Sequence, residues 1–310
     1  MLSRTADHLF WLSRYIERAE NTARMLDVNY QTSLMPQQAA VAEQSWRSLL
    51  SISELTPDYE ARYGRIDARR VIEFVVRDER NPSSIYNCLR AARENARAVR
   101  GALTTEVWET SNQTWLEFQR LIADGLLDRD PAALFEWVKF RSHLSRGVTV
   151  GTMLQDEAFN FLRIGSFLER ADNTARLLDV KFYTPDSGGS AQDFYHWSAL
   201  LRSVSGFEIY RKVYSNVIQP DKVAELLILR SAMPRSLAHS MQRVVENLRR
   251  VANEQSGETL RQAGRLSAEL SYGSIDEILA GGLHEYLDRF LCRVGQLGLD
   301  ISRDFLVPVH

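Results

Sequence analysis

A group of two acidic residues and two arginines occurs twice in the sequence. Residues 17–30 read ERAENTARMLDVNY and residues 169–182 read ERADNTARLLDVKF, with ten identical positions of fourteen. On a helix, Glu20 and Arg24 stand four residues apart in the favourable acid-first order, and Glu17 lies on the same side. Such a set can form a fixed ion-pair network. It can equally bind an anionic or amide ligand, with a carboxylate acting as general base.

We therefore treat both copies of the motif as one candidate site, either a structural network or a polar pocket. Its residues are Glu17, Arg18, Glu20, Asn21 and Arg24 in the first copy and Glu169, Arg170, Asp172, Asn173 and Arg176 in the second. A similar but less regular set of residues occurs in a later helix of each half and supplies secondary candidates. They either form a solvated helix face or contribute side chains to the two motif sites from another helix. These residues are Glu94, Asn95, Arg97, Glu246, Asn247 and Arg249. No residue can be assigned a catalytic role.

The apolar residues around the motif predict the element that must position it. They recur at steps of three and four, as a helix requires, at Leu9, Leu12, Ile16, Ala19, Ala23, Leu26 and Tyr30. A second apolar strip, Phe10, Met25 and Val28, lies on the far side of the same helix. A helix that is apolar on two faces is expected to be sandwiched, so Glu17, Glu20 and Arg24 should be largely buried. Buried charges must be paired.

The register of the repeated motif extends along the chain. Residues 81–85 and 94–97 match residues 233–237 and 246–249 at the same offset of 152. This pattern predicts an all-α protein: a tandem-duplicated helical bundle with about six helices per half, related by a pseudo-two-fold axis. The halves are residues 1–150 and 151–310, joined without a flexible linker and packed as one body. Proline is tolerated in a first helical turn, so Pro82, Pro131 and Pro234 are each expected to mark one.

Several functional classes are excluded or disfavoured. The six histidines are dispersed, and no sequence pattern for zinc, di-iron, nucleotide phosphate or a hydrolase nucleophile is present. We therefore expect no metal and no cofactor. With 38 basic and 40 acidic residues and a net charge of −2, the chain has no field to attract nucleic acid. It also has no apolar run long enough to cross a membrane and no secretory signal pattern, so we expect a cytoplasmic location.

The motifs nevertheless suggest a family. The opening MLSRTADHLFWLSRYIERAENTARMLDV, the later RENARAVRGALTTEVWE and the second FLRIGSFLERADNTARLLDV resemble the bacterial alpha-E family. This is an all-helical domain named for a Glu-Arg motif, here Glu17-Arg18 and Glu169-Arg170. The resemblance implies association with systems that contain an ATP-grasp ligase and a transglutaminase-like peptidase, which form or process amide bonds. It supplies no catalytic residue.

Three hypotheses for function follow. The first is a non-catalytic helical adaptor of an ATP-grasp-type amide ligase, which binds the ligase or the peptidase and can also bind a peptide or amino-acid ligand. The second is a helical enzyme in which Glu17 or Glu169 is a general base and Arg24 or Arg176 holds a substrate carboxylate. The third is a structural dimerisation module.

Overall fold

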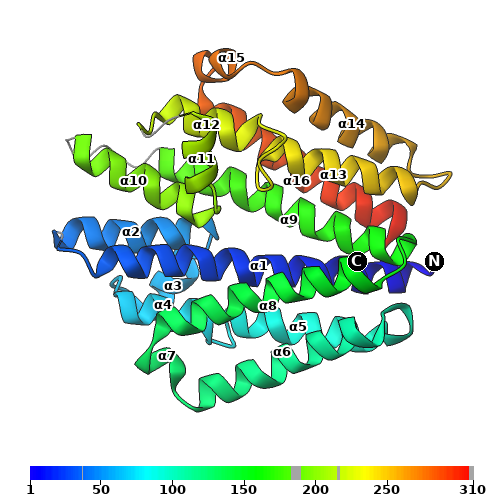
Figure 1. Ribbon diagram of the computed structural model, residues 1–310, viewed down its shortest axis with the longest axis horizontal. Coiled ribbons are helices and arrows are strands. Elements are labelled where there is room, and N and C mark those ends of the chain that lie inside the picture. Colours follow the sequence, from blue (N-terminus) through cyan, green and yellow to red (C-terminus); the bar gives the residue numbers. More distant parts are fainter. Residues whose placement is uncertain (37, 183–189, 215–216, 307–310) are drawn as a thin grey trace. The chain divides into compact units, whose positions relative to one another are not determined.

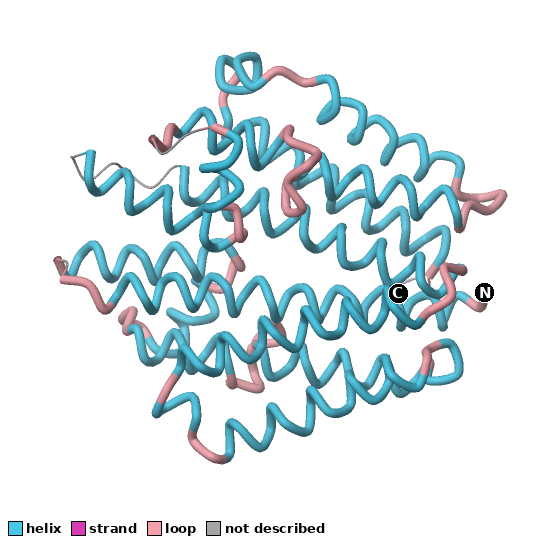
Figure 2. Tube along the Cα trace, viewed as in Figure 1, coloured by secondary structure: helices cyan, strands magenta, loops and turns pink. Residues whose placement is uncertain are grey.

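The protein is helical wherever its structure is described. The computed structural model describes residues 1–36, 38–182, 190–214 and 217–306, and within these residues it contains helices and loops but no strand (Figure 2). The helices are α1 (Ser3–Ser33), α2 (Ala39–Ile52), α3 (Thr56–Tyr63), α4 (Ala68–Val76), α5 (Ile85–Ala98), the 3-10 turn η1 (Arg100–Ala102), α6 (Thr105–Ala123), α7 (Leu126–Arg129), α8 (Pro131–Thr152), α9 (Glu157–Phe182), α10 (Ser190–Ser203), α11 (Phe207–Val213), α12 (Pro220–Ile228), α13 (Leu237–Arg250), α14 (Gly257–Tyr272), α15 (Ile275–Ala280) and α16 (Leu283–Phe305). The all-α prediction is confirmed.

The expected number of about six helices per half is too low, because α1–α8 precede residue 153 and α9–α16 follow it. The helices that the sequence pattern missed are short: α7 has four residues and α15 has six. A helix of one or two turns shows too little of the 3.6-residue period to be detected. Helix starts such as Ala68 and Pro220 lie 152 positions apart, the offset of the repeated motif. The internal duplication itself stays a prediction.

Helix starts follow local capping chemistry. Pro131 opens α8 as predicted, with the Asp130 side chain accepting a hydrogen bond from the backbone N–H of Ala133. The expectation for Pro82 and Pro234 is wrong, because both prolines precede the helix. There α5 and α13 begin after Ser84 and Ser236, whose hydroxyls accept hydrogen bonds from backbone N–H groups. Serine is a preferred N-cap, so it sets these two starts.

The chain divides into two compact units. The smaller unit comprises Tyr15–Met153, and the larger unit comprises Met1–Arg14 together with Leu154–His310. The first three turns of α1 belong to the larger unit, and the rest of this helix belongs to the smaller one. How the predicted halves pack together stays a prediction.

In the smaller unit, α6 packs against both α5 and α8, while α2 contacts α3 and α4. Its core is formed by large apolar side chains that are almost fully buried, among them Leu26, Leu50, Tyr59, Phe74, Phe118 and Phe135. The segment of α1 from Tyr15 onward supplies the motif residues to this unit.

In the larger unit, α9 is the central helix. It contacts α10, α12, α13 and α16, and α13 and α16 run beside it in the view of Figure 1. The N-terminal part of α1 approaches α9 closely at Gly165, where an added Cβ would overlap the carbonyl oxygen of Phe10 and the hydroxyl of Ser13. Glycine at this position is therefore required by the contact between the two helices.

No helix among the described residues is long and apolar enough to cross a membrane.

Candidate functional site: the Glu-Arg clusters

The first copy of the motif lies in the smaller unit, on a buried face of α1. The exposed fraction is 1% for Glu17, 0% for Glu20 and 3% for Asn21. Apolar residues on both sides of this face, including Ala19 and Met25, are buried as well. Two carboxylates are thus removed from water and require cationic or hydrogen-bonding partners.

The main partner of the two carboxylates comes from α8. Arg146 donates from Nη1 to Oε2 of Glu17 at 3.1 Å and to Oε2 of Glu20. The hydroxyl of Ser142, one turn earlier on α8, donates to the same oxygen of Glu20 at 2.7 Å. Arg146 therefore bridges the two acidic residues, the role that the sequence assigned to Arg24.

Arg24 contacts the other oxygen of Glu20. Its Nε and Nη2 both lie 2.8 Å from Oε1. Its Nη2 also lies 2.8 Å from Nε2 of His143. Nε2 of His143 also lies 3.5 Å from Oε1 of Glu20. Glu20 is thereby held by partners on both α1 and α8.

The electrostatic balance of this cluster is close to neutral, with two carboxylates facing two guanidinium groups. Burial acts to lower the pKa of Arg146, but the nearby charges of Glu17 and Glu20 and their hydrogen bonds outweigh it. The pKa of Arg146 is therefore raised above its ordinary value.

The second copy of the motif, on α9 in the larger unit, has different partners. Glu169, 7% exposed at its side chain, accepts a hydrogen bond at 2.8 Å from Nε of Arg14 on α1. Arg176 is bidentate to Asp172, at 2.8 and 3.3 Å. Arg170 is buried and donates to the backbone carbonyl of Pro234 at 3.2 Å. The two copies therefore keep their acidic residues but take a cation from different helices, α8 for Glu17 and Glu20 and α1 for Glu169.

The other predicted residues take part less directly. Arg18 lies over the ring of Tyr15, and Asn173 is half-buried on α9. Asn95 and Asn247 each donate to the carbonyl oxygen four residues earlier on their own helix. The charged secondary candidates are on exposed surface: Glu94 pairs with Arg93 and Arg97, Glu246 pairs with Arg243, and Arg249 is exposed. These contacts are those of a solvated helix face.

Sequence reasoning missed Arg146, Ser142 and His143 on α8, and Arg14 on α1. A charge count around the first motif could have pointed to Arg146. Two buried carboxylates with only Arg24 beside them leave one negative charge uncompensated, so a second cation had to come from another helix. Ser142 and Arg146 are one helical turn apart, so both side chains can contact the same carboxylate.

In the part of the chain that the structure describes, no group of three or more His, Cys, Asp or Glu side chains could hold a metal ion. The chemistry available in both clusters is that of paired carboxylates, guanidinium groups, hydroxyls and one imidazole.

The fold and the clusters together define an all-helical domain built around a buried Glu-Arg motif. The chain belongs to the Alpha-E family. The family model, described as a predicted alpha-helical domain with a conserved ER motif, matches residues 1–306. The resemblance seen in the motifs is thereby confirmed over almost the whole chain.

The chain is also similar to curated proteins of Mycobacterium bovis and Mycobacterium tuberculosis, each named an uncharacterized protein. The identity is 24% over 313 residues, and the match covers 94% of this chain and 35% of the relative. The chain thus spans about a third of the length of these relatives. No solved structure matches it.

Proposed function

We propose that the chain is a helical adaptor, without catalytic activity of its own, in a system that forms or processes amide bonds. Its partner is an ATP-grasp-type ligase or a transglutaminase-like peptidase, as the family resemblance implies, and it presents or binds a peptide-like substrate of that partner.

The observation that carries the proposal is the engagement of the motif carboxylates. Glu20 accepts hydrogen bonds from Ser142, Arg24 and Arg146, and Glu169 accepts one from Arg14. A general base must lie within hydrogen-bond reach of a substrate proton, whereas Glu17 and Glu169 are only 1% and 5% exposed, and Glu17 accepts a hydrogen bond from Arg146. Carboxylates fixed by guanidinium groups are instead suited to hold helices together. This favours an adaptor over an enzyme that uses Glu17 or Glu169 as a base.

The length of the relatives gives separate support. The region similar to this chain makes up 35% of each mycobacterial relative, so in those proteins it is joined to a considerable further length of chain. A helical region that occurs as part of longer chains fits a module that acts together with other domains.

The first experiment tests the partner. The tagged chain is crosslinked in cells of its native host and purified, and the captured proteins are identified by mass spectrometry against an untagged culture. We expect enrichment of an ATP-grasp-type ligase or a transglutaminase-like peptidase. Recovery of neither protein after crosslinking would contradict the proposal.

The second experiment separates the adaptor from the enzyme. The recovered partner is assayed for ATP-dependent amide formation with the wild-type chain, with Glu17→Gln and Glu169→Gln, and with Glu258→Gln, whose side chain is 49% exposed, as control. An adaptor stimulates the partner in every variant that stays folded. If either motif variant abolishes activity while its melting temperature equals that of the control, the enzyme hypothesis is correct instead.

A further inference from the structure

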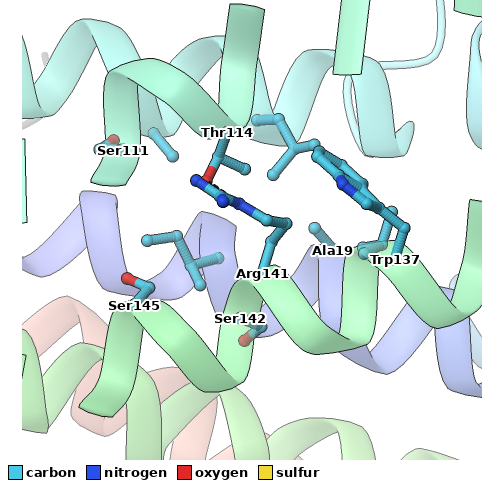
Figure 3. Close-up of a pocket in the computed structure, with 11 residues that line it drawn as sticks. Ala19, Ser111, Thr114, Trp137, Arg141, Ser142 and Ser145 are labelled. Atoms are coloured by element: carbon cyan, nitrogen blue, oxygen red, sulfur yellow. Dashed lines mark hydrogen bonds between the residues drawn. The ribbon is translucent and has the colours of Figure 1, made fainter. Parts of the chain in front are cut away.

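A small cavity lies within the smaller unit, lined by residues of α1, α5, α6 and α8 (Figure 3). Its volume of about 20 Å³ leaves room for one or two groups of the size of a water molecule. Its lining combines apolar side chains, among them Ile16, Leu89 and Trp137, with Arg141 and the hydroxyl side chains of α6 and α8. The cavity therefore offers a positive charge and an apolar surface together.

Arg141 is the charged residue of this cavity, and its side chain is only 12% exposed. Figure 3 shows it extending from α8 toward Thr114 on α6. Its Nε donates to Oγ1 of Thr114 at 2.9 Å, and its Nη2 donates to the backbone oxygen of Thr110 at 3.1 Å. Both acceptors are neutral.

The carboxylate of Glu117 does not form a hydrogen bond with Arg141. Oε2 of Glu117 lies 3.9 Å from Nη1, which is too far for a hydrogen bond. A guanidinium has five N–H donors, so three of those on Arg141 form no hydrogen bond with the described residues. Burial accordingly lowers the pKa of Arg141, against a smaller opposing effect of Glu117. The cation is short of anionic partners.

Two hydroxyls of the same cavity are also available. Ser111 on α6 and Ser145 on α8 line it, and neither hydroxyl forms a hydrogen bond with any part of the chain that the structure describes. Ser145 stands four residues after Arg141 and Ser111 three before Thr114, so each lies on the same helix face as its neighbour. In Figure 3 both serines lie to the left of the Arg141 guanidinium.

The positions 152 residues further along the chain indicate that helix packing does not require these polar groups. Ser111, Thr114 and Ser145 correspond at that offset to Ala263, Leu266 and Leu297. All three of these apolar residues are buried, with 0%, 3% and 1% exposed. Under the predicted repeat, the same core place is thus filled by apolar side chains in the larger unit.

We propose that this cavity binds a small aliphatic carboxylate, with the carboxylate on the Arg141 guanidinium and the hydroxyls of Ser111 and Ser145, and the aliphatic part against Trp137. A carboxylate matches the guanidinium bidentately. Acetate, with four heavy atoms, is a smaller anion than phosphate, with five, and a small anion suits the small volume of this cavity. The three proposed ligand groups are not residues of the Glu-Arg clusters, although Ser142, which donates to Glu20, also lines the cavity. The proposal does not depend on the adaptor function.

Acetate is the probe, and acetamide, which has the same shape without the charge, is its control. Each is titrated at constant ionic strength into protein labelled with ¹⁵N at tryptophan, while the indole signal of Trp137, assigned with Trp137→Phe, is followed by NMR. We expect saturable shifts with acetate and none with acetamide. Arg141→Gln should weaken acetate binding at least tenfold, since it removes a charge-assisted contact.

The control variant is Arg120→Gln, because Arg120 is on α6 but its side chain is 69% exposed. It should bind acetate as the wild type does. If Arg141→Gln does not fold, two other measurements test the proposal. One is acetate binding by the double variant Ser111→Ala, Ser145→Ala, and the other is the comparison of acetate with acetamide in the wild type. The proposal is overturned if acetate causes no saturable shift, if acetamide or phosphate binds as well, or if the folded cavity variants keep wild-type affinity.

Discussion

Arg146 supplies the charge that allows Glu17 and Glu20 to be buried together. Both acidic side chains are at most 1% exposed, and Arg146 contacts each of them. Removing one partner of a buried ion pair leaves an uncompensated charge out of water, which typically costs about 3–5 kcal/mol. Since the Arg146 side chain is itself 25% exposed, we expect its loss to cost an amount at the low end of this range.

The corresponding prediction is that Arg146→Met lowers the free energy of unfolding by about 3 kcal/mol. Urea unfolding monitored by circular dichroism measures this value. The control is Arg97→Met in the same unit, where the pair with Glu94 is exposed and should contribute below about 1 kcal/mol. Equal losses in the two variants would mean that the cluster does not depend on Arg146, whereas adding Glu20→Gln to Arg146→Met should restore part of the loss.

His284 in the larger unit gives the protein a pH-dependent contact. Its Nδ1 lies 2.7 Å from Oδ1 of Asp179, and this hydrogen bond, together with the carboxylate charge, raises the pKa of His284 above 6.5. A raised folded-state pKa means that the folded state binds the proton more tightly than the unfolded chain. The contribution to stability is therefore complete below about pH 6.5 and is lost as the pH rises through the folded-state pKa.

An NMR titration of the His284 ring tests this expectation directly. We expect the wild-type pKa to lie above 6.5 and to fall toward that value in Asp179→Asn, which keeps the shape of the side chain without its charge. A wild-type pKa at or below 6.5 would show that the contact with Asp179 does not favour the protonated ring in solution.

At the scale of elements, the close approach of α1 to α9 depends on one glycine, Gly165, which has no side chain. A Cβ on Gly165 would overlap the backbone oxygen of Phe10 and the hydroxyl of Ser13. The serine side chain can rotate away, but the carbonyl belongs to a helix backbone and cannot move alone. The two helices would have to separate, and with them the pair between Arg14 and Glu169.

We therefore predict that Gly165→Ala destabilises the protein by about 1–3 kcal/mol, the usual cost of overpacking. Gly264 in α14 is the matched control, because nothing lies within 4 Å of a Cβ added there. Alanine is the better helix former, so Gly264→Ala should stabilise by up to about 1 kcal/mol. Thermal unfolding of the two variants should shift the melting temperature in opposite directions. A stabilising effect of Gly165→Ala would contradict the close approach.

At the scale of the whole molecule, the sequence was sufficient to predict an all-helical protein and its family. The periodic apolar residues of α1 and α9 extend over many turns, so their signal is strong. Short helices such as α7 and α15 could not be predicted, because they contain at most about one and a half turns. The starts of α5 and α13 were misjudged because the caps Ser84 and Ser236 determine them rather than the prolines.

The candidate site could be predicted in part. Identical spacing in both copies located the acidic residues and their nearest arginines, since these contacts lie within one helix. The bridging cations could not be located in the same way. Arg146 and Arg14 are distant in sequence from the carboxylates that they contact, and no local pattern distinguishes them from the other arginines of the chain. Only the folded arrangement of α1, α8 and α9 within their units brings each pair together.

The division of α1 between the two units has a consequence for synthesis. Met1–Arg14 leave the ribosome before the smaller unit but pack in the unit that contains Leu154–His310. About 150 further residues must be made before α9 is available, which takes roughly 8–30 s at ~5–20 residues per second. During that interval Leu9 and Phe10, at most 2% exposed in the folded protein, have no partner helix from their own unit. The smaller unit, which ends at Met153, can therefore be completed on the ribosome before α9 (Glu157–Phe182) is available to Met1–Arg14.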